Sequence, residues 1–215
     1  TSVEFFYKDM RNVIDFRDHA DLLFNDRLEG DVRTGKGYSY GAEILVRKNE
    51  GAFTGWISYT YSRAFRKVAA INEGKEYQAP YDKPHNVNLV LNYEFTPRIS
   101  ASANFVYATG TPMTKPIGTF EIDDNAVFIY SDRNSSRMRD YHRLDLSLTI
   151  KDKGAPDRFW HGEWVFSIYN VYGRHNDWMI NYQNKFEGTS SEVKEATRTY
   201  LPFLFFPGIT YNFYF

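Results

Sequence analysis

The residue types that most often perform chemistry are spread along this 215-residue chain without a catalytic or metal-binding arrangement. Cysteine is absent, which excludes disulfides and thiolate metal sites. The chain has no phosphate-binding loop, no nucleophile elbow and no zinc-protease motif. No metal-ligand spacing relates the five histidines, which are His19, His85, His142, His161 and His175. We therefore expect no enzymatic activity and no cofactor, and we expect His85 and His142, at strand starts, to form hydrogen bonds.

One group of acidic side chains could bind a hard cation. The segment 110–139 contains the carboxylates of Glu121, Asp123, Asp124 and Asp132. Oxygen ligands of this kind are those that Ca²⁺ prefers. Asp123, Asp124 and Asp132 are therefore candidate calcium ligands. The alternative is an acidic loop exposed to solvent, which explains the same residues without a bound metal.

Aromatic and arginine side chains in the long polar segments are candidates for contact with a small ligand. They are Tyr130, Arg137, Arg139 and Trp178. An aromatic ring stacks on flat or apolar ligand faces, and a guanidinium group donates several hydrogen bonds. This combination suits sugars, siderophores and peptides equally, so the sequence does not identify the ligand.

Alternation of apolar and polar residues with a period of two predicts eight strands, and the polar segments named above connect them. Their approximate ranges are 2–16, 38–48, 53–66, 86–95, 99–109, 141–151, 163–172 and 206–215. A phase slip near Arg11 and Asn12 predicts a β-bulge in the first strand. No helix longer than one turn is expected. The fold class is therefore all-β, with a single segment spanning residues 1–215.

The connections between these strands alternate between long and short. Long loops are predicted at 17–36, 67–83, 110–139 and 174–198, with strand-like pieces at 126–130 and 178–182. Outer-membrane barrels have long extracellular loops at one rim and short periplasmic turns at the other. Strands of about ten residues match a tilted crossing of the hydrocarbon layer. The pattern predicts a transmembrane antiparallel β-barrel in the bacterial outer membrane, with the C-terminus at the periplasmic side.

The final strand has an apolar residue at every second position. The row consists of Ile209, Tyr211, Phe213 and Phe215. On an exposed edge strand in water such a row favours aggregation, whereas in a membrane barrel it faces lipid. The row resembles the signal that barrel assembly machinery reads before insertion. The alternative is a half-buried terminal strand of a soluble β protein.

Six further stretches, in order along the chain, carry a resemblance to a family. They are VEFFYKDMRN (3–12), GYSYGAE (37–43), GWISYTYS (55–62), YDKPHNVN (81–88), YHRLDL (141–146) and WVFSIYNVY (164–172). Together with the aromatic end they resemble the C-terminal barrel of TonB-dependent outer-membrane receptors. No single stretch is diagnostic, but the resemblance covers essentially the whole chain.

This resemblance implies the last eight up-and-down strands of a barrel of about 22 strands, with the plug domain outside this sequence. It also implies energised uptake of a nutrient bound at the extracellular loops. The implied partners are the lipid bilayer, the remaining barrel strands and plug, the TonB complex through the missing N-terminal part, the barrel assembly machinery and a surface lipoprotein. The net charge of −1 argues against a nucleic-acid partner. The alternatives are a stand-alone eight-stranded barrel, acting as a structural protein or adhesin, and an outer-membrane enzyme.

Overall fold

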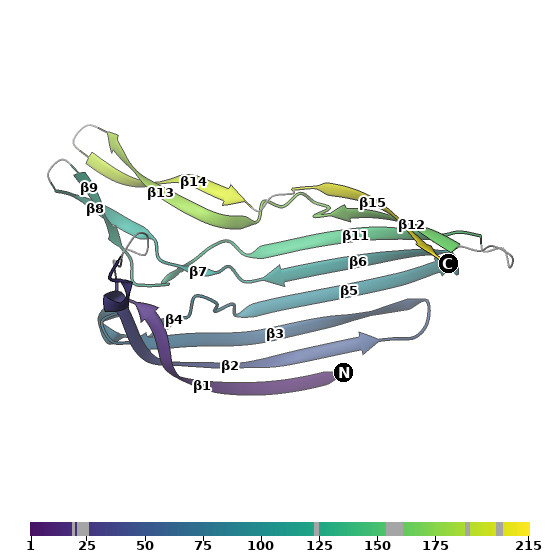
Figure 1. Cartoon of the computed structure of the whole chain (residues 1–215), viewed down its shortest axis with the longest axis horizontal. Helices are drawn as coiled ribbons and strands as arrows, with labels where there is room; N and C mark the ends of the chain where they lie inside the picture. Colours follow the sequence, from purple (N-terminus) through teal and green to yellow (C-terminus); the bar gives the residue numbers. More distant parts are fainter. Residues whose placement is uncertain (19, 21–25, 123–124, 154–160, 188–189, 201–203) are drawn as a thin grey trace.

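A large antiparallel sheet dominates the computed structural model, which describes residues 1–215 except 19, 21–25, 123–124, 154–160, 188–189 and 201–203. Eight long strands follow one another across this sheet in chain order (Figure 1). They are β1 (Ser2–Phe16), β2 (Val32–Lys48), β3 (Phe53–Val68), β5 (His85–Thr96), β6 (Ile99–Ala108), β11 (Tyr141–Lys151), β12 (His161–Tyr169) and β15 (Phe206–Tyr214). The short strand β4 (Tyr77–Gln78) pairs with β3. The all-β, antiparallel prediction is confirmed.

The bounds of the long strands agree closely with those predicted, because period-two alternation persists along each of them. The main difference is β2, which begins at Val32 rather than near residue 38. The described strands do not close into a barrel, since β1 and β15 form the two edges of the sheet. In the described part of the chain, no helix is long and apolar enough to span a membrane.

The predicted bulge in β1 is present. The pairing of β1 with β2 shifts between Arg11 and Val13, and Asn12 has a φ of 56°. Asparagine tolerates this left-handed conformation better than most residues. The extra residue reverses which face the following side chains occupy.

The register between strands joins their apolar positions into one continuous face. Residues directly opposite each other on neighbouring strands lie on the same face. One such row crosses six strands and contains Phe53, Tyr93, Ala101, Leu148, Phe166 and Ile209. The adjacent row on the other face contains Thr54, Asn92, Ser102, Ser147, Ser167 and Gly208. The sheet therefore has an apolar face and a polar face.

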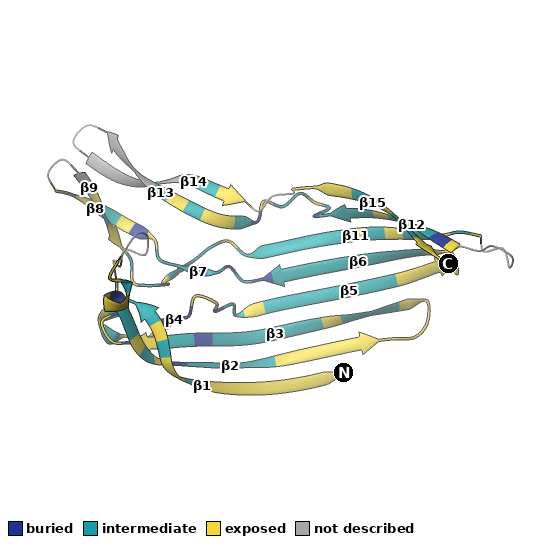
Figure 2. Cartoon of the chain, viewed as in Figure 1, coloured by how far each residue is buried: buried dark blue, intermediate teal, exposed yellow. Residues whose placement is uncertain are grey.

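The apolar face is not covered by a second layer of the described residues. Phe5 is 82% exposed and Ile209 is 69% exposed, and most of the sheet has intermediate or exposed residues (Figure 2). Among the residues that the structure describes, the buried apolar cluster consists of Val68, Ile71 and Tyr77, at one end of the sheet. These side chains pack against one another at the end of β3 and in the connection to β5. They stabilise this connection and do not form a core beneath the sheet.

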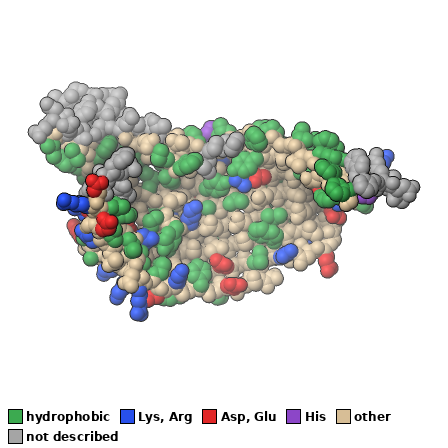
Figure 3. Space-filling model, in the orientation of Figure 1, with side chains coloured by type: hydrophobic (Ala, Val, Ile, Leu, Met, Phe, Trp, Pro, Cys, Tyr) green, Lys and Arg blue, Asp and Glu red, His purple; other side chains and the backbone are tan. Residues whose placement is uncertain are grey.

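The polar face has its own hydrogen bonds between side chains. The Ser102 hydroxyl donates to Asn92 Oδ1 at 2.7 Å, and Arg143 Nε donates to Asp145 Oδ2 at 3.0 Å. Figure 3 shows one face of the molecule, on which hydrophobic side chains lie in separate groups with charged side chains between some of them. Polar groups on this face thus bond to one another along and across the strands.

The long connections all lie at one end of the sheet, opposite the two chain termini (Figure 1). They contain more regular structure than the sequence predicted. The elements are η1 (Leu28–Asp31), η2 (Asn72–Gly74), β7 (Pro112–Met113), β8 (Pro116–Ile122), β9 (Asn125–Tyr130), β10 (Ser136–Arg137), β13 (Asp177–Glu187) and β14 (Ser190–Tyr200). The pieces expected at 126–130 and 178–182 belong to two hairpins, β8–β9 and β13–β14. We call this end of the molecule the loop end.

Candidate functional site

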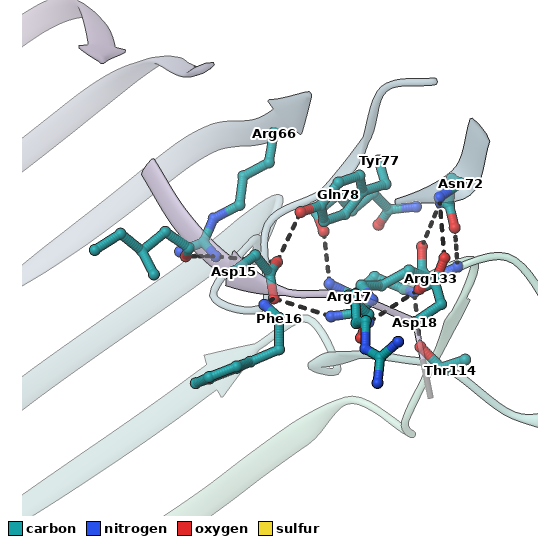
Figure 4. Close-up of polar contacts among 12 residues, drawn as sticks. Asp15, Phe16, Arg17, Asp18, Arg66, Asn72, Tyr77, Gln78, Thr114 and Arg133 are labelled. Carbon is teal, nitrogen blue, oxygen red and sulfur yellow. Dashed lines mark hydrogen bonds and ion pairs between the residues drawn. The ribbon is translucent and has the colours of Figure 1, made fainter. Parts of the chain in front are cut away.

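Arg133 links three parts of the chain at the loop end (Figure 4). Its Nη1 donates to Asp15 Oδ1 at 2.9 Å and its Nη2 donates to Asp18 Oδ1 at 3.0 Å. Its backbone N–H donates to Asn72 Oδ1 at 2.7 Å. Asp15 lies near the end of β1 and Asp18 just after it, Asn72 belongs to η2, and Arg133 follows β9. Arg133 therefore fixes the segment after β9 against the end of β1.

Asp15 receives further donors at the same place. The Tyr77 hydroxyl donates to Asp15 Oδ2 at 2.7 Å, and Arg66 Nη1 lies 3.3 Å from the same oxygen. Burial raises the pKa of Tyr77, and the hydrogen bond to Asp15 raises it further. Tyr77 therefore remains a neutral donor, and Asp15 accepts from two arginines and one tyrosine.

A second network surrounds Asp82, whose side chain is fully buried. The backbone N–H of Ala64 donates to Asp82 Oδ1 at 2.6 Å, and Arg63 Nε lies 3.3 Å from the same oxygen. Arg137 donates to the other carboxylate oxygen and, at 2.7 Å, to the Asp82 carbonyl oxygen. Two arginines and an amide satisfy this buried carboxylate, so its role is to hold the loops together.

The segment 131–137 is thus attached to the connection between β3 and β5 at several points. Asn134, which is buried, donates from Nδ2 to the Gln78 carbonyl oxygen at 2.7 Å. Its backbone N–H donates to Thr114 Oγ1 at 3.1 Å. With Arg133 before it and Arg137 after it, this segment is held along its length.

A pocket of about 550 Å³ opens beside the Arg133 network. Its lining combines the end of β1, the region of η2 and the segment 114–134. The ionisable and aromatic residues that line it are Asp15, Asp18, Glu73, Tyr130, Asp132 and Arg133. This size lies within the range of small-molecule sites.

The structure does not bring the four predicted ligand-contact residues together. Tyr130 lines the pocket, whereas Arg137 lies in the Asp82 network. Arg139 is elsewhere, with its Nε 3.1 Å from Asp177 Oδ2. Trp178 is 62% exposed on β13. The four candidates therefore do not form one site.

Arg139 and Arg198 hold the base of the hairpin β13–β14 through Asp177. Arg198 Nη1 lies 2.5 Å from Asp177 Oδ2. Burial raises the pKa of Asp177, but the hydrogen bond from Arg139 and the charges of both arginines outweigh this effect and place the pKa below its usual value. Asp177 is therefore an anionic anchor for the hairpin at neutral pH.

The calcium hypothesis is tested only in part. Asp123 and Asp124 lie outside the described residues, and Asp132 lines the pocket. Among the residues that the structure describes, no group of three or more potential metal ligands is present. Calcium binding at Asp123, Asp124 and Asp132 stays a prediction.

The two histidines at strand starts form hydrogen bonds, as expected. Nδ1 of His85 lies 2.8 Å from the Tyr59 hydroxyl, and Nδ1 of His142 lies 2.8 Å from the Tyr172 hydroxyl. The first pair connects β3 with β5, and the second connects β11 with the turn that follows β12. These contacts account for both side chains without a ligand.

The terminal apolar row is placed as its alternation predicts. Ile209 and Tyr211 pair with Phe166 and Trp164 of β12, and the rings of Tyr211 and Trp164 are 4.7 Å apart. Phe213 is 60% exposed, and Phe215 follows the end of β15. Recognition of this row during insertion stays a prediction.

Sequence reasoning missed most of the residues that build the loop end. Asp15 and Arg133 are 118 positions apart, so no local pattern relates them. Asp82 lies within the stretch 81–88, one of those that carry the family resemblance. This stretch is the one sequence signal that includes Asp82. Val68 and Ile71 begin and end the apolar run 68–71, and Tyr77 lies in the polar segment that follows; apolar residues within a predicted loop are a local signal of packing.

Comparison of the chain with protein-family models, with curated proteins and with solved structures gave no match.

Proposed function

We propose that this chain is part of the barrel wall of a TonB-dependent outer-membrane receptor that binds a nutrient at its loop end and takes part in its uptake into the periplasm. The observation that carries the proposal is the continuous, uncovered apolar face of the eight-stranded sheet. Soluble proteins rarely expose so extended an apolar surface to water. Lipid would cover this face without a second protein layer.

The polar face supports the same proposal. Its polar positions consist mainly of Ser, Thr, Asn and Gly with few Lys, which suits packing against other protein. A face of this kind suits the interior of a barrel that is filled by a plug domain. The plug and the segment that engages the TonB complex would lie elsewhere in the protein.

The edges of the sheet favour a larger barrel. β1 and β15 both have one side without a partner strand in the described sheet. Unpaired backbone groups in lipid cost several kcal/mol each. Further strands would therefore continue the sheet at both edges, giving a closed barrel of about 22 strands.

In this proposal the barrel wall is passive. Its apolar face holds the protein in the outer membrane, the loop end captures the ligand outside the cell, and the plug controls passage. The barrel assembly machinery would insert the chain, and a surface lipoprotein is a further proposed partner. The short turns and the C-terminus would face the periplasm.

The absence of cysteine from these residues allows a direct test of orientation and function. Single cysteines are introduced in the full-length protein as Ser131→Cys at the loop end and Glu50→Cys in a short turn. A membrane-impermeant maleimide should label the first in intact cells, and the second only after the outer membrane is permeabilised. Uptake of the nutrient should stop when the TonB complex is inactivated.

Equal labelling of both positions in intact cells would contradict the membrane topology. Correct labelling with uptake that does not depend on the TonB complex would instead favour another class of barrel. A native polypeptide no longer than this chain would favour the stand-alone eight-stranded barrel.

A further inference from the structure

We propose that the 550 Å³ pocket beside Arg133 binds an uncharged, hydroxyl-rich ligand, such as a neutral oligosaccharide. This inference rests on the proposed function, because it assigns a ligand class to the same loop end. It follows from the charges of the pocket, from the hydrogen-bonding groups in it and from the way its lining is held.

The charges of the pocket are largely paired within the protein. Asp15 pairs with Arg66 and Arg133, and Asp18 pairs with Arg133. Glu73 lies 2.7 Å from Lys75 Nζ. Each of these carboxylates already has a cation, so the pocket has little need of a charged ligand to balance it.

An anionic ligand would be disfavoured. The lining contains four carboxylates and one arginine, which gives a formal charge of −3 from these residues. Arg66 and Lys75, which pair with two of the carboxylates, reduce this value to −1. The single lining arginine, Arg133, is already bound to Asp15 and Asp18, so it is not available to a ligand carboxylate or phosphate.

The remaining polar lining consists of Thr114, Ser131, Asn134 and Asp132. Several of their atoms are already bonded within the protein: Thr114 Oγ1 accepts from the Asn134 N–H, and Ser131 Oγ accepts from the Lys115 N–H and donates to the Asp132 carbonyl oxygen. The Thr114 hydroxyl can still donate a hydrogen bond, and the Asp132 carboxylate can accept. A sugar hydroxyl also donates and accepts, and a carboxylate can accept from two hydroxyls at once. The mixture of groups therefore matches a polyol better than an ion.

Tyr130 supplies an aromatic surface at the same pocket. Its side chain is 45% exposed, and its ring centroid lies 5.9 Å from that of Phe128 on the same strand. The apolar face of a pyranose ring can pack on such a ring while its hydroxyls reach the polar side chains.

The lining is held in place before any ligand binds. Arg133 and Asn134 are fixed by hydrogen bonds to Asn72 and Gln78. Asp132 directly precedes Arg133 in the chain, and Tyr130 lies two positions before Asp132. A site that is already ordered loses little conformational entropy when it binds.

The test measures binding to the purified full-length protein by calorimetry. The probes are three neutral trisaccharides (maltotriose, cellotriose and mannotriose), citrate as an anion and spermidine as a cation. We expect at least one trisaccharide to bind and citrate not to bind. Tyr130→Ala should weaken trisaccharide binding roughly tenfold, whereas Tyr130→Phe should preserve it because the ring is retained.

Asp132→Ala should also weaken trisaccharide binding, because it removes the acceptor. Glu50→Gln, in a short turn at the opposite end of the sheet, is the control for loss of one negative charge and should leave binding unchanged. Tyr130 and Asp132 are both exposed, so the variants should keep the thermal stability of the parent protein.

The proposal is overturned if none of the trisaccharides binds, if only citrate or spermidine binds, or if trisaccharide binding is unaffected by Tyr130→Ala and Asp132→Ala. Failure of this kind in a protein that shows the expected cysteine labelling and TonB-dependent uptake would reject the ligand class alone. Failure of labelling or of TonB dependence would reject the proposed function.

Discussion

At the scale of single residues, the loop end depends on a few carboxylates with unusually many partners. Asp82 has a fully buried side chain, two arginine partners and an amide donor. Asp15 has two arginines and the Tyr77 hydroxyl. Removing one member of a buried ion pair leaves the other charge without compensation, so such residues are difficult to replace.

Asp82→Ala should therefore destabilise the loop end by about 3 kcal/mol, because Arg63 and Arg137 lose their common partner. Both arginines are partly exposed, which keeps the expected loss at the lower end of the range for buried pairs. The measurement is protease cleavage between β3 and β5 in the full-length protein. Asp9→Ala is the control, since the Asp9–Arg11 pair is exposed and should contribute almost nothing. Similar cleavage of both variants would show that Asp82 has no special structural role.

At the scale of elements, the sequence predicted the long strands well and the loops poorly. Each long strand has an apolar residue at about every second position along its length, so its place in the chain can be predicted from this alternation alone. Strands β8, β13 and β14 do not alternate in this way, and their hairpins form by pairing within a loop. The candidate site depends on contacts between distant loops, such as Arg133 with Asp15, which no local pattern encodes.

The hairpin β13–β14 should loosen at acidic pH through Asp177. The pKa of Asp177 in the folded protein lies below its usual value, so the stabilisation is present above the usual aspartate pKa of about 4 and is lost as the pH falls through the lower, folded value. Hydrogen exchange in β13, corrected for its intrinsic pH dependence, should be slow at pH 5 to 7 and faster below about pH 4.

Asp177→Asn should give fast exchange in β13 at every pH in this range, because Arg139 and Arg198 then lack a charged partner. Glu50→Gln, far from the hairpin, should behave like the unchanged protein. A pH profile of Asp177→Asn identical to that of the parent would assign the effect to another group.

At the scale of the whole molecule, the two faces of the sheet differ in the surroundings that they favour: one favours apolar contacts and the other favours polar contacts. The strands contribute mostly apolar side chains to one face and mostly polar ones to the other, and the register preserves this division between neighbouring strands. No described layer covers the apolar face, and in the proposed position lipid would supply its apolar contacts. The proposed membrane position explains this division without any further protein element.

Charges introduced on the two faces should therefore have different costs in the membrane-inserted protein. Leu89→Lys and Leu146→Lys place a charge on the apolar face and should each cost about 2–4 kcal/mol near the middle of the bilayer. Asn88→Lys and Ser147→Lys, one residue away on the polar face, are matched controls and should cost less. Unfolding by denaturant in lipid vesicles measures the difference. Equal losses for both pairs would mean that the faces are not lipid-facing and interior as proposed.

The bulge at Asn12 limits how loops can be exchanged between proteins of this kind. Before the bulge, odd-numbered residues of β1 such as Tyr7 belong to the apolar face, and after it Asp15 belongs to the polar face, where it meets Arg133. The number of residues between Tyr7 and Asp15 can therefore change only by an even number if both side chains are to stay on their present faces. A graft that replaces the first long loop but shortens this part of β1 by one residue would turn Asp15 toward the apolar face. Loop engineering should therefore treat residues 7–15 as a unit of fixed length.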